Sequence, residues 1–137
     1  MHGDDSALNE KQLAGALLFS KYNCGGCHTG GTFGGQMLQK LGVLKPWPNQ
    51  RDTDYYEVTK QPAHKMFFRV QGLRNVEKTG PYFHDGSIHT LKHAIQQMSI
   101  HERGHPLGFD EIILIEEFLK SLTGTLPKDY IRPPELP

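Results

Sequence analysis

The residues best suited to chemistry are the two cysteines of the chain, Cys24 and Cys27, which are separated by two glycines and followed by His28. Cys-x-x-Cys-His is the attachment sequence for c-type haem, in which two thiols add to the two vinyl groups of one porphyrin. The histidine then binds the iron as the proximal ligand. The spacing therefore predicts one covalently attached haem.

Two other uses of a Cys-x-x-Cys pair fit this sequence less well. A thioredoxin-like redox disulfide occurs in a βαβ context, which the sequence pattern does not show. A structural zinc site needs a second pair of ligands at similar spacing, and the chain has no further cysteine. Covalent haem is the interpretation that we retain.

The residue on the opposite side of the iron decides whether a haem transfers electrons or binds small molecules. The candidates are methionines and histidines: Met37, Met66, Met98, His64, His84, His89, His93, His101 and His105. Met98 is favoured because it lies well downstream, at the end of a short predicted helix, where a flexible thioether could reach the iron. The alternative is a methionine that only fills the core.

Other side chains could contact the haem or act near it. Arg69 and Arg74 carry the planar guanidinium that pairs well with haem propionates, or they are ordinary surface arginines. His84 and Asp85 form either an acid/base pair or a pair that orders a loop, and we expect the second. Four aromatic residues could donate to a propionate or pack against the porphyrin: Trp47, Tyr55, Tyr56 and Tyr82.

A first helix is predicted directly before the attachment sequence. Asn9 is a suitable N-cap, and Gln12 stands three residues later in capping-box position. The helix should run from about Glu10 to Tyr22. Gly15 either lets another helix approach closely or is simply tolerated. The helix is expected to bury one apolar face, made of Leu13, Leu17, Leu18 and Phe19.

Two more helices are predicted near the other end. Thr90 is a good N-cap for a shorter helix that ends near Met98. Asp110 can cap a last helix, with Gly124 as its stop signal. The last helix has a long row of apolar residues that should face a core: Ile112, Ile113, Ile115, Phe118, Leu119 and Leu122.

The region between residues 29 and 87 is rich in glycine and proline, which leaves room only for short helices or strands. A long loop in a compact domain is usually functional or anchored to something, and a buried porphyrin would be such an anchor. The predicted fold class is therefore mostly α, with long loops around a core that contains the cofactor. Residues 1–8 and 126–137 are expected to be extended termini.

The length and composition of the chain limit the expected number of domains and the classes of partner. The chain has 137 residues, the length of one domain, so we expect a single domain over residues 1–137. Fifteen basic residues balance fifteen acidic ones, which gives no reason to expect nucleic acid or an anionic membrane as partner. No apolar run approaches the ~20 residues of a membrane span.

One charge pattern bears on protein partners. No charged residue lies between Lys21 and Lys40, an interval that holds the whole attachment sequence. An uncharged rim at a haem edge can dock a redox protein with little desolvation cost and release it quickly, or its glycines only fold against the haem. Docking of this kind predicts that electron exchange depends weakly on ionic strength.

The way in which haem c is attached predicts the cellular location of the protein. Haem c is attached after export, so we expect a bacterial periplasmic protein. The apolar run from Leu13 to Phe19 has neither a basic leader nor a small-residue cleavage site. The signal peptide is therefore expected to be absent from this chain.

Two longer stretches carry a resemblance to a known family. The first runs from Phe68 to Val76 (FRVQGLRNV) and the second from Thr79 to Ser87 (TGPYFHDGS). They resemble the C-terminal haem domain of the bacterial dihaem cytochrome c peroxidase family. The likeness covers nearly the whole chain and continues through Leu91, Ala94, Ile95 and Met98 to Glu117–Gly124 (EFLKSLTG).

The resemblance implies a cytochrome c-like helical domain wrapped around one covalent haem. In that family this domain holds the high-potential, electron-accepting haem, and its axial ligands would match His28 and Met98. Methionine ligation stabilises ferrous iron, raises the reduction potential and closes the iron to substrates. Met98 is therefore expected to be the second ligand.

The chain also departs from the family. Members have a preceding domain with a second Cys-x-x-Cys-His, and this sequence has one attachment site. It also lacks that domain's switchable histidine ligand and acid/base glutamate in a recognisable context. The family binds calcium through carbonyls that match Thr79 and Pro81 and through an asparagine of the first domain. Because half of that site is missing, we rank calcium binding low.

Three functions remain. The first is a monohaem electron carrier between redox proteins, with no catalytic residues of its own. The second is a peroxide-reducing haem enzyme whose site opens by loss of Met98, alone or with a separate haem subunit. The third is an electron-accepting domain of a larger enzyme, in which an exposed apolar patch could drive homodimerisation of an otherwise monomeric chain.

Overall fold

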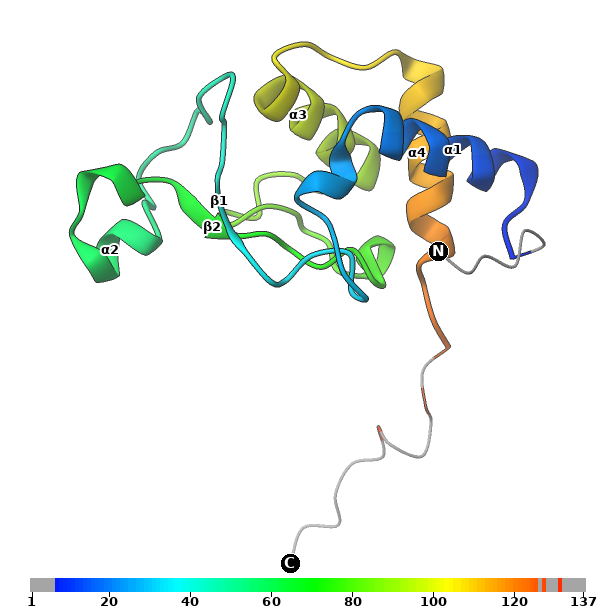
Figure 1. Ribbon diagram of the computed structural model, residues 1–137, viewed down its shortest axis with the longest axis horizontal. Coiled ribbons are helices and arrows are strands. Elements are labelled where there is room, and N and C mark those ends of the chain that lie inside the picture. The colour runs from blue at the N-terminus through cyan, green and yellow to red at the C-terminus, as the bar shows by residue number, and fades with distance from the viewer. Residues whose placement is uncertain (1–6, 126, 128–130, 132–137) are drawn as a thin grey trace, which may run out of the picture.

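The computed structural model describes residues 7–125, 127 and 131 (Figure 1). Within them the prediction of a mostly helical fold is confirmed, and residues 29–87 contain only short elements, as expected. The predicted extended termini lie largely outside the described residues. The elements, in chain order, are α1 Glu10–Lys21, η1 Cys24–Gly26, β1 Leu38–Lys40, α2 Tyr55–Thr59, η2 Pro62–His64, β2 Phe67–Arg69, η3 Val76–Lys78, α3 Leu91–Arg103 and α4 Phe109–Ser121.

Helices α1 and α4 cross at a steep angle near the two ends of the chain (Figure 1). The crossing is centred on Gly15, because a Cβ atom there would lie 1.9 Å from the carbonyl oxygen of Leu114. One turn later Phe19 packs against Phe118, with ring centroids 5.3 Å apart. The close helix approach predicted as one role of Gly15 is confirmed.

The capping box of α1 is also confirmed, but its predicted apolar face is confirmed only for Leu18 and Phe19. The Asn9 side chain accepts from the Gln12 amide, and the Gln12 side chain accepts from the Asn9 amide, each at 3.0 Å. Leu13 and Leu17 are 48% and 64% exposed. The crossing at Gly15 turns the row of residues that includes Phe19 toward α4, which leaves the Leu13 and Leu17 row in solvent.

Helix α3 begins where predicted and ends later. The Thr90 side chain accepts from the His93 amide at 3.3 Å. The helix then continues to Arg103 and stops at Gly104, whose φ of 84° suits glycine. Met98 therefore lies within the helix, and the prediction that the helix ends there is wrong.

The start of α4 differs from the prediction by two residues. Gly108 is the N-cap, and its amide donates to the Glu111 carboxylate at 3.0 Å. Asp110 lies inside the first turn, where its negative charge is favourable beside the helix N-terminus. The Glu111 side chain, which bonds back to the Gly108 amide, provides the capping interaction that was expected from Asp110.

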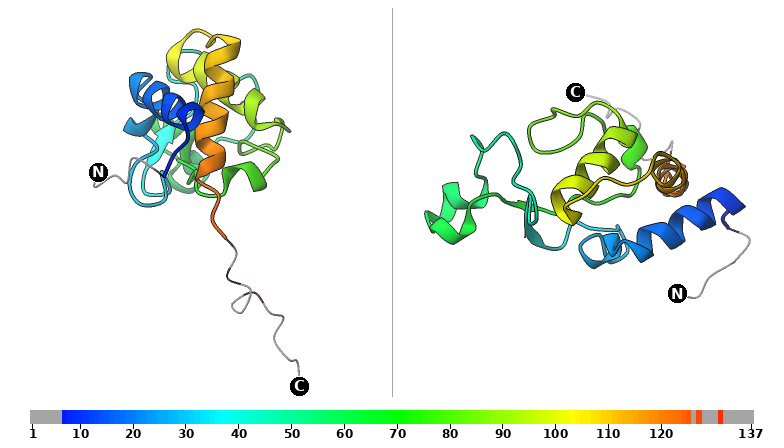
Figure 2. Two further views of the ribbon diagram at one scale, coloured as in Figure 1. Left: turned by 90° about the vertical axis from the view of Figure 1, so that its right-hand side faces the viewer. Right: turned by 90° about the horizontal axis from the view of Figure 1, so that it is seen from above.

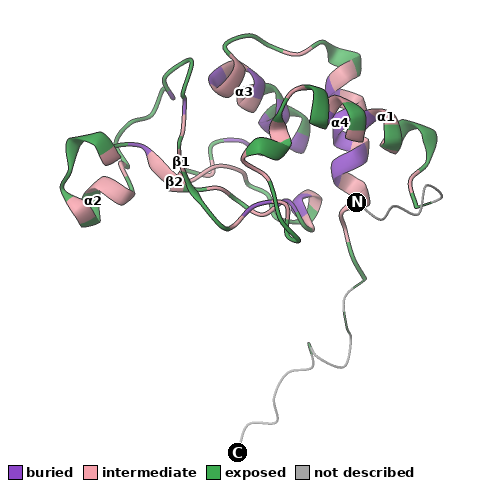
Figure 3. Cartoon of the chain, viewed as in Figure 1, coloured by how far each residue is buried: buried purple, intermediate pink, exposed green. Residues whose placement is uncertain are grey.

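Buried side chains form two separate clusters, and Figure 3 shows them concentrated along α3 and α4. Tyr82 is partly buried and packs against both clusters. The Phe118 cluster consists of Phe19, Leu73, Val76, Leu91, Ile95, Ile112, Ile115, Phe118 and Leu119. The Trp47 cluster consists of Trp47, Met66, Ile88 and Ala94.

The small sheet and α2 lie away from the α1–α4 crossing (Figure 2). Strands β1 and β2 pair antiparallel, with Leu38 opposite Arg69 and Lys40 opposite Phe67. None of the α2 residues is buried. Among the described residues no helix is both long and apolar enough to cross a lipid bilayer.

Candidate functional site

A tight turn directly after α1 carries the cysteines and His28. Helix α1 is followed by Asn23 in the left-handed conformation, with φ of 56°, and the single turn η1 begins at Cys24. The amides of Cys27 and His28 both donate to the Cys24 carbonyl, at 3.3 and 3.0 Å. Both thiols are free. The turn therefore presents two thiols and one imidazole from a single short segment.

The thiols do not have the character of a catalytic disulfide. Burial raises the pKa of Cys24, and burial together with the Glu102 carboxylate raises the pKa of Cys27. Redox cysteines of the thioredoxin type have a lowered pKa, because the thiolate is the reactive species. No group of three His, Cys, Asp or Glu side chains in the described part of the chain could hold a metal ion. The raised pKa values of both thiols therefore do not match a thioredoxin-like redox pair.

His28 is held in the form that a metal ligand needs. Its Nδ1 donates to the carbonyl oxygen of Gln71 at 3.0 Å, because a carbonyl can only accept. The Nε2 lone pair is then available for iron. Burial lowers the pKa of His28, which favours the neutral imidazole. The ring also lies beside Phe19 of α1, with centroids 6.4 Å apart.

Gly34 fixes the position of the carbonyl that His28 uses. A Cβ atom on Gly34 would lie 2.3 Å from the Gln71 oxygen, and the φ of Gly34 is 130°. The next amide, Gly35, donates to Val70 at 2.7 Å. Neither Gln71 nor Gly34 could be predicted from the sequence as part of the site, because a backbone acceptor and a close backbone contact leave no side-chain signature.

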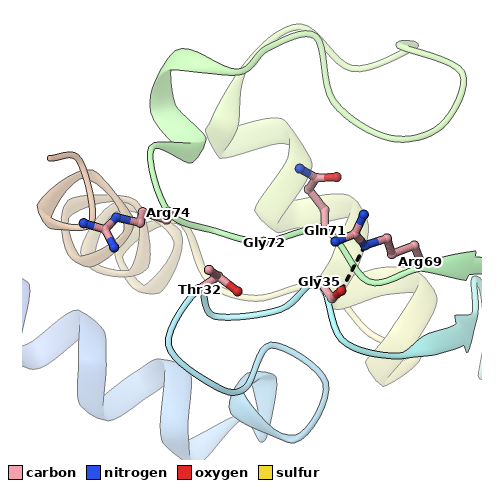
Figure 4. Close-up of a pocket in the computed structure, with 6 residues that line it drawn as sticks. All are labelled: Thr32, Gly35, Arg69, Gln71, Gly72 and Arg74. Carbon is pink, nitrogen blue, oxygen red and sulfur yellow. Dashed lines mark hydrogen bonds between the residues drawn. The ribbon is translucent and has the colours of Figure 1, made fainter. Parts of the chain in front are cut away.

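Arg69 and Arg74 line one pocket of about 290 Å³ (Figure 4). Arg69 Nε donates to the Gly35 carbonyl at 2.9 Å. The Arg74 guanidinium extends instead toward Gly124, just after α4. Gln71 lines the same pocket, so the pocket adjoins the segment that orients His28. The two arginines are brought to one pocket, but their guanidinium groups do not converge on one anion.

Most candidates for the second axial ligand have other partners or face solvent. Met66 is buried in the Trp47 cluster, and Met37 is 39% exposed. His101 donates to the Lys45 carbonyl at 2.7 Å, and His64 bonds to Thr59 at 2.9 Å. The remaining exposed histidines are His89, His93 and His105.

Met98 occupies a distinctive place on α3. Ala94, one turn before it, belongs to the Trp47 cluster, and Ile95 belongs to the Phe118 cluster. Met98 thus lies between the parts of the helix that touch the two clusters. It is half-buried and belongs to neither cluster. Among the described residues, neither apolar cluster therefore takes up its thioether.

His84 is the other side chain without a partner. Its ring stacks on Phe68, with centroids 4.2 Å apart. Both ring nitrogens are buried and have no hydrogen-bond partner among the described residues. His84 and Met98 are therefore the two candidates that the structure leaves available.

Asp85 and two of the four aromatic donors, Trp47 and Tyr82, have structural partners. Burial acts to raise the pKa of Asp85, but hydrogen bonds from Ser87 and Trp47 outweigh it and hold the pKa below its ordinary value. The Ser87 amide donates at 3.1 Å, and Trp47 Nε1 donates at 3.4 Å. Tyr82 donates its hydroxyl to the Val76 carbonyl at 3.0 Å. These bonds support the expected loop-ordering role of Asp85.

Similarity to known proteins identifies the family. No protein-family model matches the chain. It is 40% identical over 128 residues to the cytochrome c551 peroxidase of Nitrosomonas europaea and 36% identical over 133 residues to that of Pseudomonas aeruginosa. The chain is a homologue of one domain of the cytochrome c peroxidases. Each match covers 93% of this chain and 38% of the relative, so the chain spans little more than a third of those proteins.

The fold has a counterpart among solved structures. A MauG-like protein associated with microbial copper homeostasis matches with a TM-score of 0.67. The match covers 86% of this chain and 48% of that one, at 23% sequence identity. It confirms the predicted mostly helical, cytochrome-like fold class.

Proposed function

We propose that this chain is a c-type cytochrome with one haem that transfers single electrons between redox proteins. Cys24 and Cys27 would hold the haem covalently, and His28 would bind the iron through Nε2. Haem c, when bound, supplies one-electron chemistry between ferric and ferrous iron. The observation that carries the proposal is the hydrogen bond from His28 Nδ1 to Gln71, because it fixes the tautomer of a metal-binding histidine.

Met98 supports electron transfer over reaction with a substrate. It lies on the buried side of α3 between two apolar clusters, and it packs into neither of them. A thioether opposite His28 would leave no open position on the iron and would raise the reduction potential. We therefore assign His28 and Met98 as the axial pair, and we keep Arg69 as the better placed of the two arginines for a propionate.

The alternative is a peroxide-reducing enzyme, or the electron-accepting domain or subunit of one. The 40% identity to a cytochrome c peroxidase favours this alternative. A second haem domain or subunit would then complete the site. The hydrogen bonds that Asp85 accepts from Ser87 and Trp47 speak against an acid/base pair with His84 in this chain.

The proposal extends to place and partners. Attachment of haem c after export supports a bacterial periplasmic location. The uncharged interval between Lys21 and Lys40 surrounds the cysteine turn and supports docking of redox proteins that release quickly. The proposed carrier needs no calcium, and it acts as a monomer or a homodimer.

The proposal can be tested by expressing the chain behind a periplasmic leader, so that haem is attached after export, and by assaying the purified holoprotein. The denatured protein should carry the mass of one haem. The reduced protein should pass one electron to an oxidised small cytochrome and should turn over hydrogen peroxide no faster than free haem does. Rapid peroxide turnover with an electron donor would reverse the ranking in favour of the enzyme, and absence of covalent haem would refute both functions.

A further inference from the structure

A second pocket, of about 370 Å³, lies on the side of the molecule that carries the small sheet (Figure 1). Two segments line it: residues 40–50, which start at the end of β1, and residues 62–66, which precede β2. The Leu41 amide donates to the Met66 carbonyl at 2.8 Å, so a backbone hydrogen bond joins the two segments. Neither cysteine nor His28 lines this pocket. Its volume is that of a small-molecule site.

A tight turn at Gly42 shapes one wall of the pocket. The φ of Gly42 is 80°, and a Cβ atom there would lie 2.7 Å from the Trp47 amide nitrogen. The Gly42 amide also donates to the Glu102 carboxylate of α3 at 2.7 Å. The chain therefore folds back on itself, and both Leu41 and Trp47 line the pocket. Because backbone contacts hold this turn, the wall is formed without a ligand.

Buried apolar side chains form the floor of the pocket. Trp47 and Met66 are 4% and 5% exposed, and both belong to the Trp47 cluster. The exposed residues Pro46, Pro62 and Ala63 complete the apolar lining. An indole, a thioether and two proline rings offer flat, polarisable surface, which suits contact with an aromatic ring.

The charged groups of the lining are two lysines, Lys40 and Lys65. No acidic side chain lines the pocket, and neither lysine forms an ion pair within the described part of the chain. Lys65 Nζ lies 5.1 Å from the ring centroid of Tyr56, a contact that holds the ammonium group and keeps its charge. Glu57 of α2 is already paired with Lys60 at 2.8 Å. The edge of the pocket is therefore positively charged.

We infer that this pocket binds a small aromatic carboxylate, with its ring against Trp47 and Met66 and its carboxylate toward Lys40 and Lys65. Burial of the ring supplies most of the affinity, and the exposed lysines add an attraction that salt weakens. The ligand is bound and not converted. The inference does not rest on the proposed electron transfer, because the pocket is lined without the cysteine turn.

Titration of the reduced holoprotein with naphthoate, followed by heteronuclear NMR, tests the inference. The chain has one tryptophan, so the indole N–H of Trp47 gives a single signal from the pocket itself. This signal should shift saturably, with a Kd of about 1 mM or below. Naphthamide keeps the ring without the charge and should bind about tenfold more weakly. Acetate, which has the charge without the ring, should not shift the signal.

Substitutions in the lining identify the groups that bind. Lys40→Gln and Lys65→Gln should each weaken naphthoate binding about threefold, and the double variant about tenfold, with naphthamide binding unchanged. Lys11→Gln, which removes an exposed lysine of α1, is the matched control and should bind naphthoate as wild type does. Ala63→Leu should obstruct the pocket and weaken the binding of both probes. All four positions are exposed, so the fold should tolerate these changes.

Several results would overturn the inference. These are a Trp47 signal that does not shift with naphthoate, equal affinity for naphthoate and naphthamide, and an unchanged affinity for naphthoate in the double lysine variant. A naphthoate-dependent change in the Soret band would place the ligand at the haem and would also count against the pocket. If Ala63→Leu does not fold, the lysine variants decide. Absence of covalent haem would refute the proposed function alone, because the same titration of the purified chain still tests the pocket.

Discussion

The orientation of His28 depends on a backbone atom. The Gln71 carbonyl accepts from Nδ1, and Gly34 lies so close to that carbonyl that it has no space for a side chain. The residue type at position 71 is therefore less important than the path of the chain through residues 70–72. A mutation that moves the backbone of residues 70–72 can consequently change the orientation of the His28 ring, even though the mutated side chain does not contact that ring.

Gly34→Ala should lower the free energy of unfolding of the holoprotein by at least about 2 kcal/mol, because the new Cβ meets the Gln71 carbonyl at a φ that disfavours alanine. Denaturant unfolding of the purified protein measures this change. Gly31→Ala is the matched control in the same loop, since a Cβ there meets nothing within 4 Å. Equal stability of the two variants would contradict the proposed role of Gly34.

Met98→Ala should abolish the weak far-red absorption band that a methionine-ligated ferric haem shows, because no thioether would remain opposite His28. The optical spectrum of the oxidised holoprotein measures the band. Met37→Ala removes an exposed methionine and should leave the band intact. Persistence of the band in Met98→Ala would remove Met98 from the axial pair and point to another methionine, such as Met66 of the Trp47 cluster.

At the scale of elements, the sequence predicted helices better than it predicted their faces. The N-caps of α1 and α3 could be predicted from the sequence, because Asn9, Gln12 and Thr90 form their capping hydrogen bonds within one turn of the helix. The exposure of Leu13 and Leu17 could not be predicted from the sequence. The close backbone contact of Gly15 with α4 determines which side of α1 is buried.

The same contrast applies to the candidate site. The cysteines and His28 could be identified because their chemistry needs particular side chains at a fixed spacing. Gln71 and Gly34 could not, since their roles depend on which loops meet beside His28. Tertiary proximity of this kind leaves no periodic pattern in a single sequence.

Gly15→Ala should destabilise the protein by about 1–3 kcal/mol, even though alanine favours a helix by up to about 1 kcal/mol. The steric clash outweighs the gain in helix propensity, because the added Cβ would lie 1.9 Å from the Leu114 carbonyl oxygen. Chemical denaturation measures the change in midpoint. Leu17→Ala on the exposed row of α1 should change stability by less than about 0.5 kcal/mol. A larger loss in Leu17→Ala than in Gly15→Ala would contradict the crossing described here.

Tyr22→Phe tests the link between α1 and α4 through its pH dependence. A hydrogen bond from the Tyr22 hydroxyl, with the Gly108 amide, holds the pKa of Glu111 below its ordinary value near 4.5. Because the folded pKa is lowered, this stabilisation is fully present above that ordinary value and is lost as the pH falls through the folded pKa. Phenylalanine keeps the ring that Arg103 covers.

The free energies of unfolding of wild type and Tyr22→Phe should therefore differ by less than about 1 kcal/mol at neutral pH, since Glu111 is partly exposed. At about pH 3 the difference should shrink toward zero. Urea unfolding at the two pH values measures both quantities. A difference that stays constant between them would mean that the Glu111 carboxylate does not take part.

At the scale of the whole molecule, the acidic and basic charges of the chain are balanced. The chain has equal numbers of acidic and basic residues and spans little more than a third of the cytochrome c551 peroxidases that it matches. The loop before Trp47 meets the end of α3, because the amides of Gly42, Leu44 and Lys45 donate to Glu102 and His101. A partner that approaches the uncharged interval between Lys21 and Lys40 would reach the cysteine turn that lies within it.

The separation of the Phe118 and Trp47 clusters has a consequence for how the protein unfolds. Without haem, the link between them rests on α3 and on Tyr82, so each cluster should open as its own cooperative unit. Amide hydrogen exchange should then show faster opening around Met66 and Ile88 than in α4 of the haem-free chain, and one shared opening rate in the holoprotein. Equal protection in the haem-free chain would contradict this expectation. Attachment of the cofactor would therefore be the step that turns two half-domains into one folding unit.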